Sequence, residues 1–493
     1  MIALAFAAPV LHGCVTLSTP PAPGEGTVIV VTQVPANAGS ETVRSGFSLD
    51  ERYPPGSRIV ATKFDAASAA DARVLSRGFA AAGAPAPSPD LREVLFAGRR
   101  RPDSRWGIYQ ARLGGSKIRA IVELDRDCGD PVYLANDRLA FVCADDPGGA
   151  ISRPTSSLYT ASTKGAAVER ITFGAGSALD PSALQDGRIL FSMWQGPGAG
   201  RPDGGATSLF TVNPDGSMIE PFSGSHRAPA FKFRARPTAD QGVVYLAADR
   251  PAGVVLVERV ELARPQAPAQ VLPLFLERGV VREALRPYSV QPLAGGGLLV
   301  SARLESAAVR ATSAVYRAAP AGTDVSVVFD DPAWHEVEVV AMIPTPSPRG
   351  RPSALNPELQ TGTLICYDVA RTDGNVGPSP RAAHPTALSV EALTWPGGSE
   401  GAARRVVQLG EIPVQPDGSI LLEVPADVPI RVRSIDADMR EIKASEWFWL
   451  RPGEVRACFG CHENREAAPV NRYIQALDHP PARLRTLRAG LAP

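Results

Sequence analysis

The clearest candidate for chemistry in this sequence is a pair of cysteines followed by a histidine near the C-terminus, Cys458-Phe459-Gly460-Cys461-His462. Two thiols at this spacing reach the two vinyl groups of one porphyrin, and the histidine that follows presents an imidazole toward the iron. The motif therefore predicts covalent attachment of one haem c through Cys458 and Cys461, with His462 as a ligand to iron or another metal. No catalytic residue is assigned from the sequence.

Two other chemistries fit a Cys-x-x-Cys pair. One is a zinc site, for which the further ligands nearby are His479 and the carboxylates of Glu463 and Glu466. The other is a redox dithiol or a disulfide, although the βαβ context of thioredoxin-like proteins is missing. We prefer haem because a chance Cys-x-x-Cys-His match is improbable in a chain with six cysteines and six histidines.

The motif specifies neither a second axial ligand nor a wall for the porphyrin. Each candidate ligand alone is more readily a surface or structural residue, and an open iron position is equally compatible with the sequence. The candidates are His226, His335, His384, His479, Met439 and Tyr473. The run Trp447-Phe448-Trp449 is suited either to line a porphyrin face or to pack in the core as part of a strand.

The first residues resemble an export signal. The apolar stretch 1–11 is too short to span a bilayer, but its length is typical of a signal-peptide core. The sequence Leu11-His12-Gly13-Cys14 resembles a bacterial lipoprotein box, which makes Cys14 a candidate for lipid attachment. We expect residues 1–26 to be leader and linker, and the protein to work in the periplasm or outer cell envelope with a membrane tether at Cys14. The alternative is a buried first strand with an ordinary core cysteine.

The composition is that of a globular chain rich in β structure. Its 51 basic and 51 acidic residues cancel over 493 residues, which argues against nucleic acid as a partner. Glycine (45) and proline (47) are frequent between short apolar runs, and this pattern favours strands and turns. Beyond the leader, no segment offers the ~20 uninterrupted apolar residues of a membrane helix.

A unit of roughly 40 to 55 residues recurs between residues 80 and 330, the length of one four-stranded propeller blade. Its first half is interpreted as a proline, a short turn and an apolar strand, as at Asp180-Pro181. Its second half is a strand with a central aromatic residue, a turn and another strand. The central aromatic residues are Tyr109, Tyr159, Phe210 and Tyr316. Residues 209–216 resemble the TolB/WD40-like β-propeller repeat.

We therefore predict an all-β chain with a TolB-like β-propeller of about six blades over residues 27–371. Strands around 27–60 and 361–371 are expected to complete the sixth blade, beside a proline-rich connector at 345–360. Residues 372–493 are predicted to form a small β-sandwich that carries the Cys-x-x-Cys-His segment. Two stacked β-sandwiches in place of the propeller are the alternative.

Three further cysteines have structural interpretations. Cys128 and Cys143 flank a predicted hairpin at 131–142, and in an oxidising compartment they are expected to form a disulfide that staples the blade. The alternative is two buried thiols. Cys366 lies in an apolar strand and is interpreted as a core residue.

Four tracts of the chain carry a resemblance to the hydrazine synthase alpha family. Residues 414–429 and 451–466 are similar to its middle domain, and residues 180–191 and 361–369 are similar to its propeller and linker. The resemblance implies the same propeller and haem-carrying middle domain here.

The resemblance also implies roles for the motif residues. Cys458 and Cys461 hold the haem by thioether bonds, and His462 ligates either the iron or a neighbouring metal such as zinc. In the family the iron ligand is a tyrosine shortly after the motif, whereas the corresponding position here is Glu466 and the nearest tyrosine is Tyr473. The chain also ends about 30 residues past His462, without room for the family's second haem domain. Hydrazine synthesis itself is therefore not expected.

These observations favour an exported, monohaem c-type cytochrome-like protein. Its propeller docks a redox partner protein or a small molecule, and its haem carries electrons. One alternative is a haem enzyme that acts on small nitrogen or oxygen species, as in hydrazine synthase alpha. Another is a non-enzymatic binding propeller with a structural metal site. The sequence contains no Ser-His-Asp grouping, Walker loop or dinucleotide fingerprint.

Overall fold

The computed structural model describes most of the chain after the leader. The described residues are 27–38, 48–64, 69–145, 156–196, 205–223, 229–250, 253–278, 280–305, 312–322, 324–371, 385–394, 405–460 and 471–484. Several predicted residues lie outside these ranges, namely Cys14, His226, His384, Cys461, His462, Glu463 and Glu466. None of the helices within the described ranges has the length and hydrophobicity needed to cross a membrane.

The described residues are nearly all in strands or loops, as the prediction of an all-β chain requires. The helices are single turns: α1 (Leu49–Arg52) and the 3-10 turns η1 (Ala36–Ala38), η2 (Ala69–Asp71), η3 (Ala294–Gly296), η4 (Pro320–Gly322) and η5 (Gln475–Asp478).

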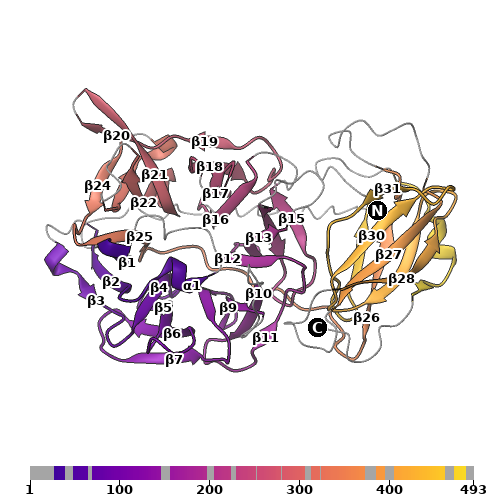
Figure 1. Cartoon of the computed structure of the whole chain (residues 1–493), viewed down its shortest axis with the longest axis horizontal. Coiled ribbons are helices and arrows are strands. Elements are labelled where there is room, and N and C mark those ends of the chain that lie inside the picture. The colour runs from indigo at the N-terminus through magenta and orange to yellow at the C-terminus, as the bar shows by residue number, and fades with distance from the viewer. Residues whose placement is uncertain are drawn as a thin grey trace, which may run out of the picture.

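Between residues 27 and 341 the described strands form six consecutive antiparallel groups, which follow one another around a common centre in Figure 1. The fourth and fifth groups are joined by one parallel pair, Thr207 with Phe231. The groups are β1 (Val28–Pro35), β2 (Arg58–Lys63) and β3 (Arg73–Val74) with β25 (Trp334–Ala341); β4 (Ala81–Pro87), β5 (Glu93–Arg99), β6 (Gly107–Arg112) and β7 (Ile118–Val122); β8 (Cys128–Tyr133), β9 (Arg138–Ala144), β10 (Ser156–Ser162) and β11 (Glu169–Arg170); β12 (Ser177–Ala183), β13 (Ile189–Gln195), β14 (Ala206–Val212) and β15 (Glu220–Ser223); β16 (Phe231–Pro237), β17 (Gly242–Ala248), β18 (Leu256–Glu261) and β19 (Gln270–Leu272); β20 (Phe275–Arg278), β21 (Val281–Pro292), β22 (Leu298–Leu304), β23 (Ala314–Ala318) and β24 (Ser326–Phe329).

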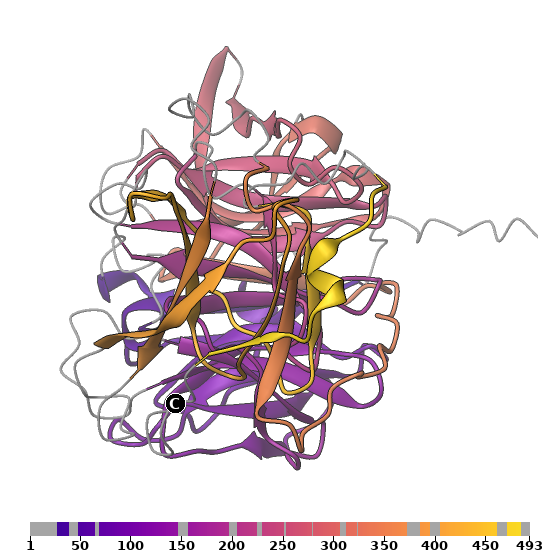
Figure 2. The same cartoon turned by 90° about the vertical axis from the view of Figure 1, so that its right-hand side faces the viewer.

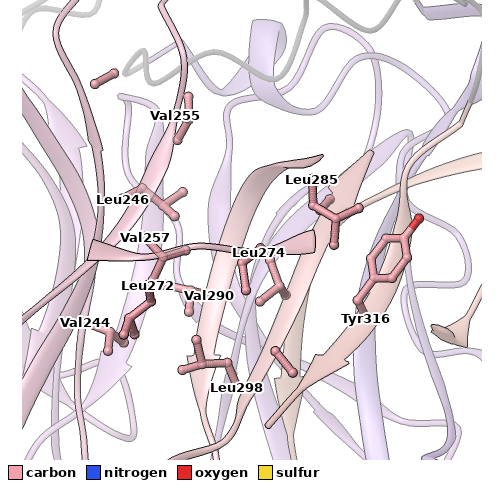
Figure 3. Packing of buried hydrophobic residues seen from close by; sticks show 14 of the residues in the cluster. Val244, Leu246, Val255, Val257, Leu272, Leu274, Leu285, Val290, Leu298 and Tyr316 are labelled. Carbon is pink, nitrogen blue, oxygen red and sulfur yellow. The ribbon is translucent and has the colours of Figure 1, made fainter. Parts of the chain in front are cut away.

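The predicted aromatic strands are confirmed. Tyr109, Tyr159 and Phe210 lie in β6, β10 and β14, the third strands of their groups, and Tyr316 lies in β23, the fourth strand of its five-stranded group. Their rings contribute to the apolar layers between neighbouring groups. Figure 3 shows one such layer, in which Leu246 and Val257 of one group face Leu285 and Tyr316 of the next.

The short turns predicted after the Asp-Pro pairs are present at 135–138 and 184–187, but the Asp-Pro pairs themselves lie inside strands. Asp130-Pro131 lies within β8 and Asp180-Pro181 lies within β12, and both strands are bulged at that point. Proline has no N–H for the strand ladder, and a bulge is a place where a strand tolerates that loss. Each proline therefore marks a bulge in the strand that precedes the predicted turn.

The same bulge recurs in β4, β8, β12 and β16, the first strands of four consecutive groups. A residue with left-handed backbone occupies each bulge: Ala84 (φ 54°), Asp130 (φ 49°), Asp180 (φ 49°) and Arg234 (φ 54°). Because a bulge redirects side chains, the repeat delivers these four positions to one central cavity.

The predicted role of residues 361–371 in completing a blade is wrong. β1 pairs with β2 on one side and with β25 on the other, and the β25 partners run from Ile29–Ala341 to Pro35–Trp334. Residues 361–366 instead form β26 of the C-terminal domain. The proline-rich connector ends the first domain before this strand, and the alternate burial along β26 suits a sheet with only one face covered.

The C-terminal domain is a sandwich of two four-stranded sheets, as predicted, and is drawn in orange and yellow in Figures 1 and 2. Its apolar core draws on both sheets, with Leu422 and Ile430 fully buried between them. One sheet has the order β32 (Val455–Cys458), β26 (Thr361–Cys366), β29 (Ile420–Pro425) and β33 (Ala482–Arg483); the other has the order β28 (Arg405–Pro413), β27 (Ala387–Thr394), β30 (Ile430–Ile435) and β31 (Glu441–Ala444).

One buried arginine fastens the sandwich to the first domain. The guanidinium of Arg451 contacts Glu169 (2.6 Å) and Asp427 (2.9 Å), and its Nε donates to the Asp215 carbonyl (2.9 Å). Nearby, the Trp449 indole is fully buried and donates to the Gly216 carbonyl (3.1 Å). These contacts fix the strand β32, and with it the cysteine motif, relative to the six-group domain.

Candidate functional site

Cys458 is the last residue of β32, at the edge of its sheet, and its side chain is half-buried against the sandwich core. The strand is held in register by parallel pairing with β26, in which the Tyr367 N–H donates to the Cys458 carbonyl (2.9 Å). The first cysteine of the motif therefore leaves the sheet from a fixed position. Cys461 and His462 lie outside the described residues.

Aromatic and close-packed contacts surround this edge. The rings of Tyr367 and Phe459 lie 5.2 Å apart between their centroids. A Cβ added at Gly460 would lie 2.6 Å from the Arg371 carbonyl oxygen, so that position accepts only glycine. The middle of the motif is thus pressed against the chain that leaves β26.

The chain after the motif returns to the same place. Arg472 donates to the carbonyls of Tyr367 (2.6 Å) and Asp417 (2.8 Å), and the Gln475 N–H donates to the Asp417 carboxylate (3.0 Å). Cys458 and Arg472 both bond to the backbone of Tyr367. Tyr367 is therefore a common contact of β32 and of the described residues from 471 on.

The described axial-ligand candidates are not gathered around Cys458 by any contact. His335 is buried in β25 of the other domain, where burial lowers its pKa and its Nδ1 accepts from the Ser313 N–H. Met439 is 61% exposed in the β30–β31 turn. Tyr473 is 67% exposed and donates to Asp478, and His479 is exposed after η5. Among described residues, no three histidines, cysteines or carboxylates are grouped to hold a metal.

The aromatic run before the motif packs the structure. Trp449 fills the junction between the two domains, and the guanidinium of Arg431 lies 4.8 Å from the Trp447 ring centroid. Phe448 contacts the sandwich core and bridges to Ile430. Of the two interpretations offered for this run, the contacts favour core packing over a porphyrin wall.

A second polar cluster, missed in the sequence, occupies the centre of the six-group domain, and we call it the axial cluster. It lines a small cavity of about 40 Å3, enough for a few water molecules. Its charged members are Arg52, Asp130, Asp180, Arg234, Arg236 and Glu338. Three positive and three negative side chains thus meet in the interior.

Most of these charges are paired by short contacts. Arg52 donates to both carboxylate oxygens of Asp130 (2.7 and 2.8 Å), a bidentate geometry. Glu338 accepts from the Tyr53 hydroxyl (2.6 Å) and lies 2.9 Å from Arg234. Asp180 lies 3.8 Å from Arg52.

The pairing decides which groups stay charged. Burial alone would raise the pKa of Glu338, but Arg234 and Arg52 outweigh it and hold that pKa at about 2. Burial and the adjacent Asp130 raise the pKa of Asp180. Burial likewise lowers the pKa of Arg236, whose guanidinium donates to the Ala235 carbonyl (2.9 Å) and, within the described residues, has no carboxylate within ion-pair distance. Asp180 and Arg236 are the members of the cluster with the weakest pairing.

A neighbouring glutamate on β25, Glu336, has its pKa shifted in the opposite direction to that of Glu338. Glu336 is fully buried, and its described hydrogen-bond partner is the side-chain amide of Gln33 (2.9 Å). Burial raises the pKa of Glu336 to about 9, so this carboxyl is neutral at pH 7. Two glutamates two residues apart therefore hold different protonation states.

Comparison with known proteins shows which family this arrangement matches. Residues 385–463 match the hydrazine synthase alpha subunit middle domain, so the match covers most of the sandwich and ends just past His462. Hydrazine synthase subunit alpha of Kuenenia stuttgartiensis is 23% identical over 89% of this chain. The chain is similar to the hydrazine synthase alpha subunit.

One solved structure shares the fold. Kuenenia stuttgartiensis hydrazine synthase superposes with a TM-score of 0.76 at 20% identity, over 93% of this chain and 72% of that chain. TolB from Acinetobacter baumannii matches 66% of this chain and 68% of its own, with a TM-score of 0.46 at 13% identity. This hydrazine synthase alpha-like chain spans 66% of the length of the curated subunit.

Proposed function

We propose that this protein carries one haem c on Cys458 and Cys461 and acts on a small nitrogen or oxygen species at the haem iron. The observation that carries the proposal is that the middle-domain match runs to residue 463 and so contains the whole Cys-x-x-Cys-His motif. This choice reverses the order expected from the sequence, which favoured an electron-transfer cytochrome, because the relatives found are named for an enzyme.

The described residues fit a covalently held haem. Cys458 lies at a sheet edge and is only half-buried, and the Tyr367–Phe459 ring pair next to it offers an apolar contact. A bound haem would supply an iron that exchanges electrons and binds small ligands. The chain's own part is to fix Cys458 through the Tyr367 N–H, while Arg472 donates to the carbonyl of the same tyrosine.

The setting proposed for this chemistry is outside the cytoplasm. The disulfide between Cys128 and Cys143 supports export, since such bonds persist in oxidising compartments. A leader at residues 1–26 and a lipid tether at Cys14 complete the proposal of a periplasmic or outer-envelope protein. Because the curated relative is named as a subunit, we also propose that protein partners dock on this chain.

We further infer that the six strand groups close into a propeller. Support comes from the pairing of β25 with β1, which joins the last strand of the domain to the first and leaves fewer exposed edges. The closed ring would present the axial cavity and the surrounding loops to a partner or a small molecule.

The test is to express the full chain with a cytochrome c maturation system and measure the mass and the absorption spectrum of the purified protein. We expect one haem per chain on the peptide with Cys458 and Cys461, and a Soret band that shifts when nitric oxide is added. A matched variant, Cys458→Ser with Cys461→Ser, should carry none. Protein that leaves a competent periplasm without covalent haem would refute the proposal, and zinc in its place would favour a structural metal site.

Electron transfer is the second candidate. It is favoured by a difference from the family, whose iron ligand is a tyrosine shortly after the motif. Here the nearest tyrosine, Tyr473, is mostly exposed and its hydroxyl donates to Asp478. The nitric oxide titration separates the two functions. A six-coordinate, low-spin iron whose spectrum ignores nitric oxide would support electron transfer.

A further inference from the structure

A second cysteine lies beside the haem motif although it is far away in sequence. Cys366 is the last residue of β26 and Cys458 is the last residue of β32, and the two are direct partners in the parallel ladder. Partners in a ladder point their side chains to the same face of the sheet. The two sulfur atoms therefore lie on one side of one sheet, at the same end of both strands.

The burial of both residues identifies that side as the sandwich interior. Cys366 is 6% exposed and belongs to the apolar core, and Cys458 is half-buried and packs against the same core. Leu364 and Arg456, two residues earlier on each strand, are also buried partners. The alternation of burial along both strands therefore indicates that the two cysteine side chains face the sandwich interior.

The spacing permits a covalent bond. Neighbouring strands run ~4.8 Å apart, and disulfides form when the two Cα atoms are about 4.4–6.8 Å apart. The molecule already bridges one pair of directly opposed cysteines, because Cys128 and Cys143 are partners across β8 and β9 and are disulfide-bonded.

We propose that Cys366 is a redox partner of Cys458, and that the two form a disulfide in the haem-free chain. The bond would compete with haem attachment, because Cys458 must be a thiol before its sulfur adds to a vinyl group. Only this consequence rests on the proposed function, since the disulfide itself does not require haem.

The chemistry balances with an ordinary disulfide oxidant. Cys366 and Cys458 lose two protons and two electrons as the S–S bond forms, and the oxidant's disulfide becomes two thiols. A dithiol reductant reverses the step by exchange and returns both thiols. Thioether formation then adds the Cys458 S–H bond across a vinyl double bond with no net electron transfer. Cys366 would thereby make haem loading depend on the supply of reductant.

The experiment maps disulfides in the full chain exported without a haem maturation system. After thiols are alkylated, trypsin places Cys366 in residues 350–371 and both motif cysteines in residues 457–465. We expect a cross-linked pair of these peptides that disappears on reduction. The Cys128–Cys143 cross-link serves as an internal control for folding and oxidation.

Three variants assign the bond. Cys461→Ser should keep the cross-link, whereas Cys458→Ser should lose it or move it to Cys461, and Cys366→Ala should lose it while keeping the Cys128–Cys143 bond. A fully alkylated Cys366 in the wild-type protein, with the motif cysteines bonded only to each other, would overturn the proposal.

A second measurement tests the competition with haem. Cells with a maturation system and limiting reductant should load more haem on Cys366→Ala than on wild type, and added reductant should remove the difference. Equal loading at every reductant level would overturn the competition. If neither protein ever carries haem while the Cys366–Cys458 cross-link is present, the proposed function fails and the disulfide stands.

Discussion

The axial cluster and the edge at Cys458 place their polar groups in opposite surroundings. In the axial cluster, Arg52 and Glu338 are buried and are joined across 286 positions of sequence by matched charges. At the edge, Cys458 is half-buried and its neighbours are a ring pair and a second cysteine. Most charges of the axial cluster are paired within the chain, whereas the side chain of Cys458 stays half-buried at the edge of its sheet. The comparison indicates that the axial cluster maintains the fold, whereas the edge at Cys458 is the place where we propose reactions.

The strongest way to break this comparison is to remove the central cation. Arg52→Met should destabilise the six-group domain by about 3–5 kcal/mol, because it removes the bidentate partner of the buried Asp130 and one of the two arginines that contact Glu338. Urea unfolding followed by tryptophan fluorescence would measure the loss. Arg101→Met, at a side chain that is 79% exposed, is the matched control and should change little. Equal stability of both variants would show that the cluster is not a structural centre.

The disulfide tests how much of the first domain depends on covalent support. Replacing Cys128 and Cys143 with alanine should cost about 3 kcal/mol, because the bond closes a loop with a sequence separation of 15 residues. Thermal unfolding with and without reductant would measure the effect. Reductant should lower the Tm of wild type and leave that of the double variant unchanged, and a reductant-insensitive wild type would contradict the prediction.

The buried carboxyl of Glu336 gives the first domain a pH dependence. Its pKa is about 9 in the folded chain and lower when unfolded, so the folded state holds an extra proton between these values. The stability from this group is complete below the unfolded pKa and falls as pH rises toward 9, by up to about 1.4 kcal/mol per pH unit. Glu336→Gln should remove that slope in unfolding curves at pH 6 to 9. A variant with the wild-type slope would place the titration elsewhere.

The smallest effect on stability is expected at the edge. Tyr367→Leu removes a ring contact with Phe459 and should cost about 0.5–1.5 kcal/mol beyond the area lost. If the ring pair contacts the haem, the same variant should shift the Soret band of the loaded protein. Val406→Ala, at an exposed side chain on β28 of the same sandwich, is the control. An unshifted spectrum would separate the ring pair from the haem.

Sequence patterns predicted the parts of the fold that are local. The aromatic strands, the sandwich and the Cys128–Cys143 pair follow from short-range alternation and spacing, and the structure confirms them. The bulges at the Asp-Pro pairs were not predicted, because a bulge is defined only by pairing with a neighbouring strand.

The candidate sites were predicted unevenly for the same reason. The haem motif is contiguous and was visible, whereas the axial cluster joins residues from α1, β8 and β25 that no spacing relates. The neighbour of Cys458 was equally hidden, since Cys366 lies in the chain long before the motif. Arg451 and Glu454 belong to a tract that had suggested the family, but their contact with the first domain required the structure.

The pairing of β1 with β25 also sets an order of events during biosynthesis. The first group of strands lacks its β25 partner until residues 334–341 have been made. During synthesis or export, the edge of β1 is therefore unpaired while the earlier strands already exist. Such a chain is exposed to aggregation for as long as that edge stays open. We therefore expect folding to depend on chaperones, and a chain truncated just before residue 334 to aggregate.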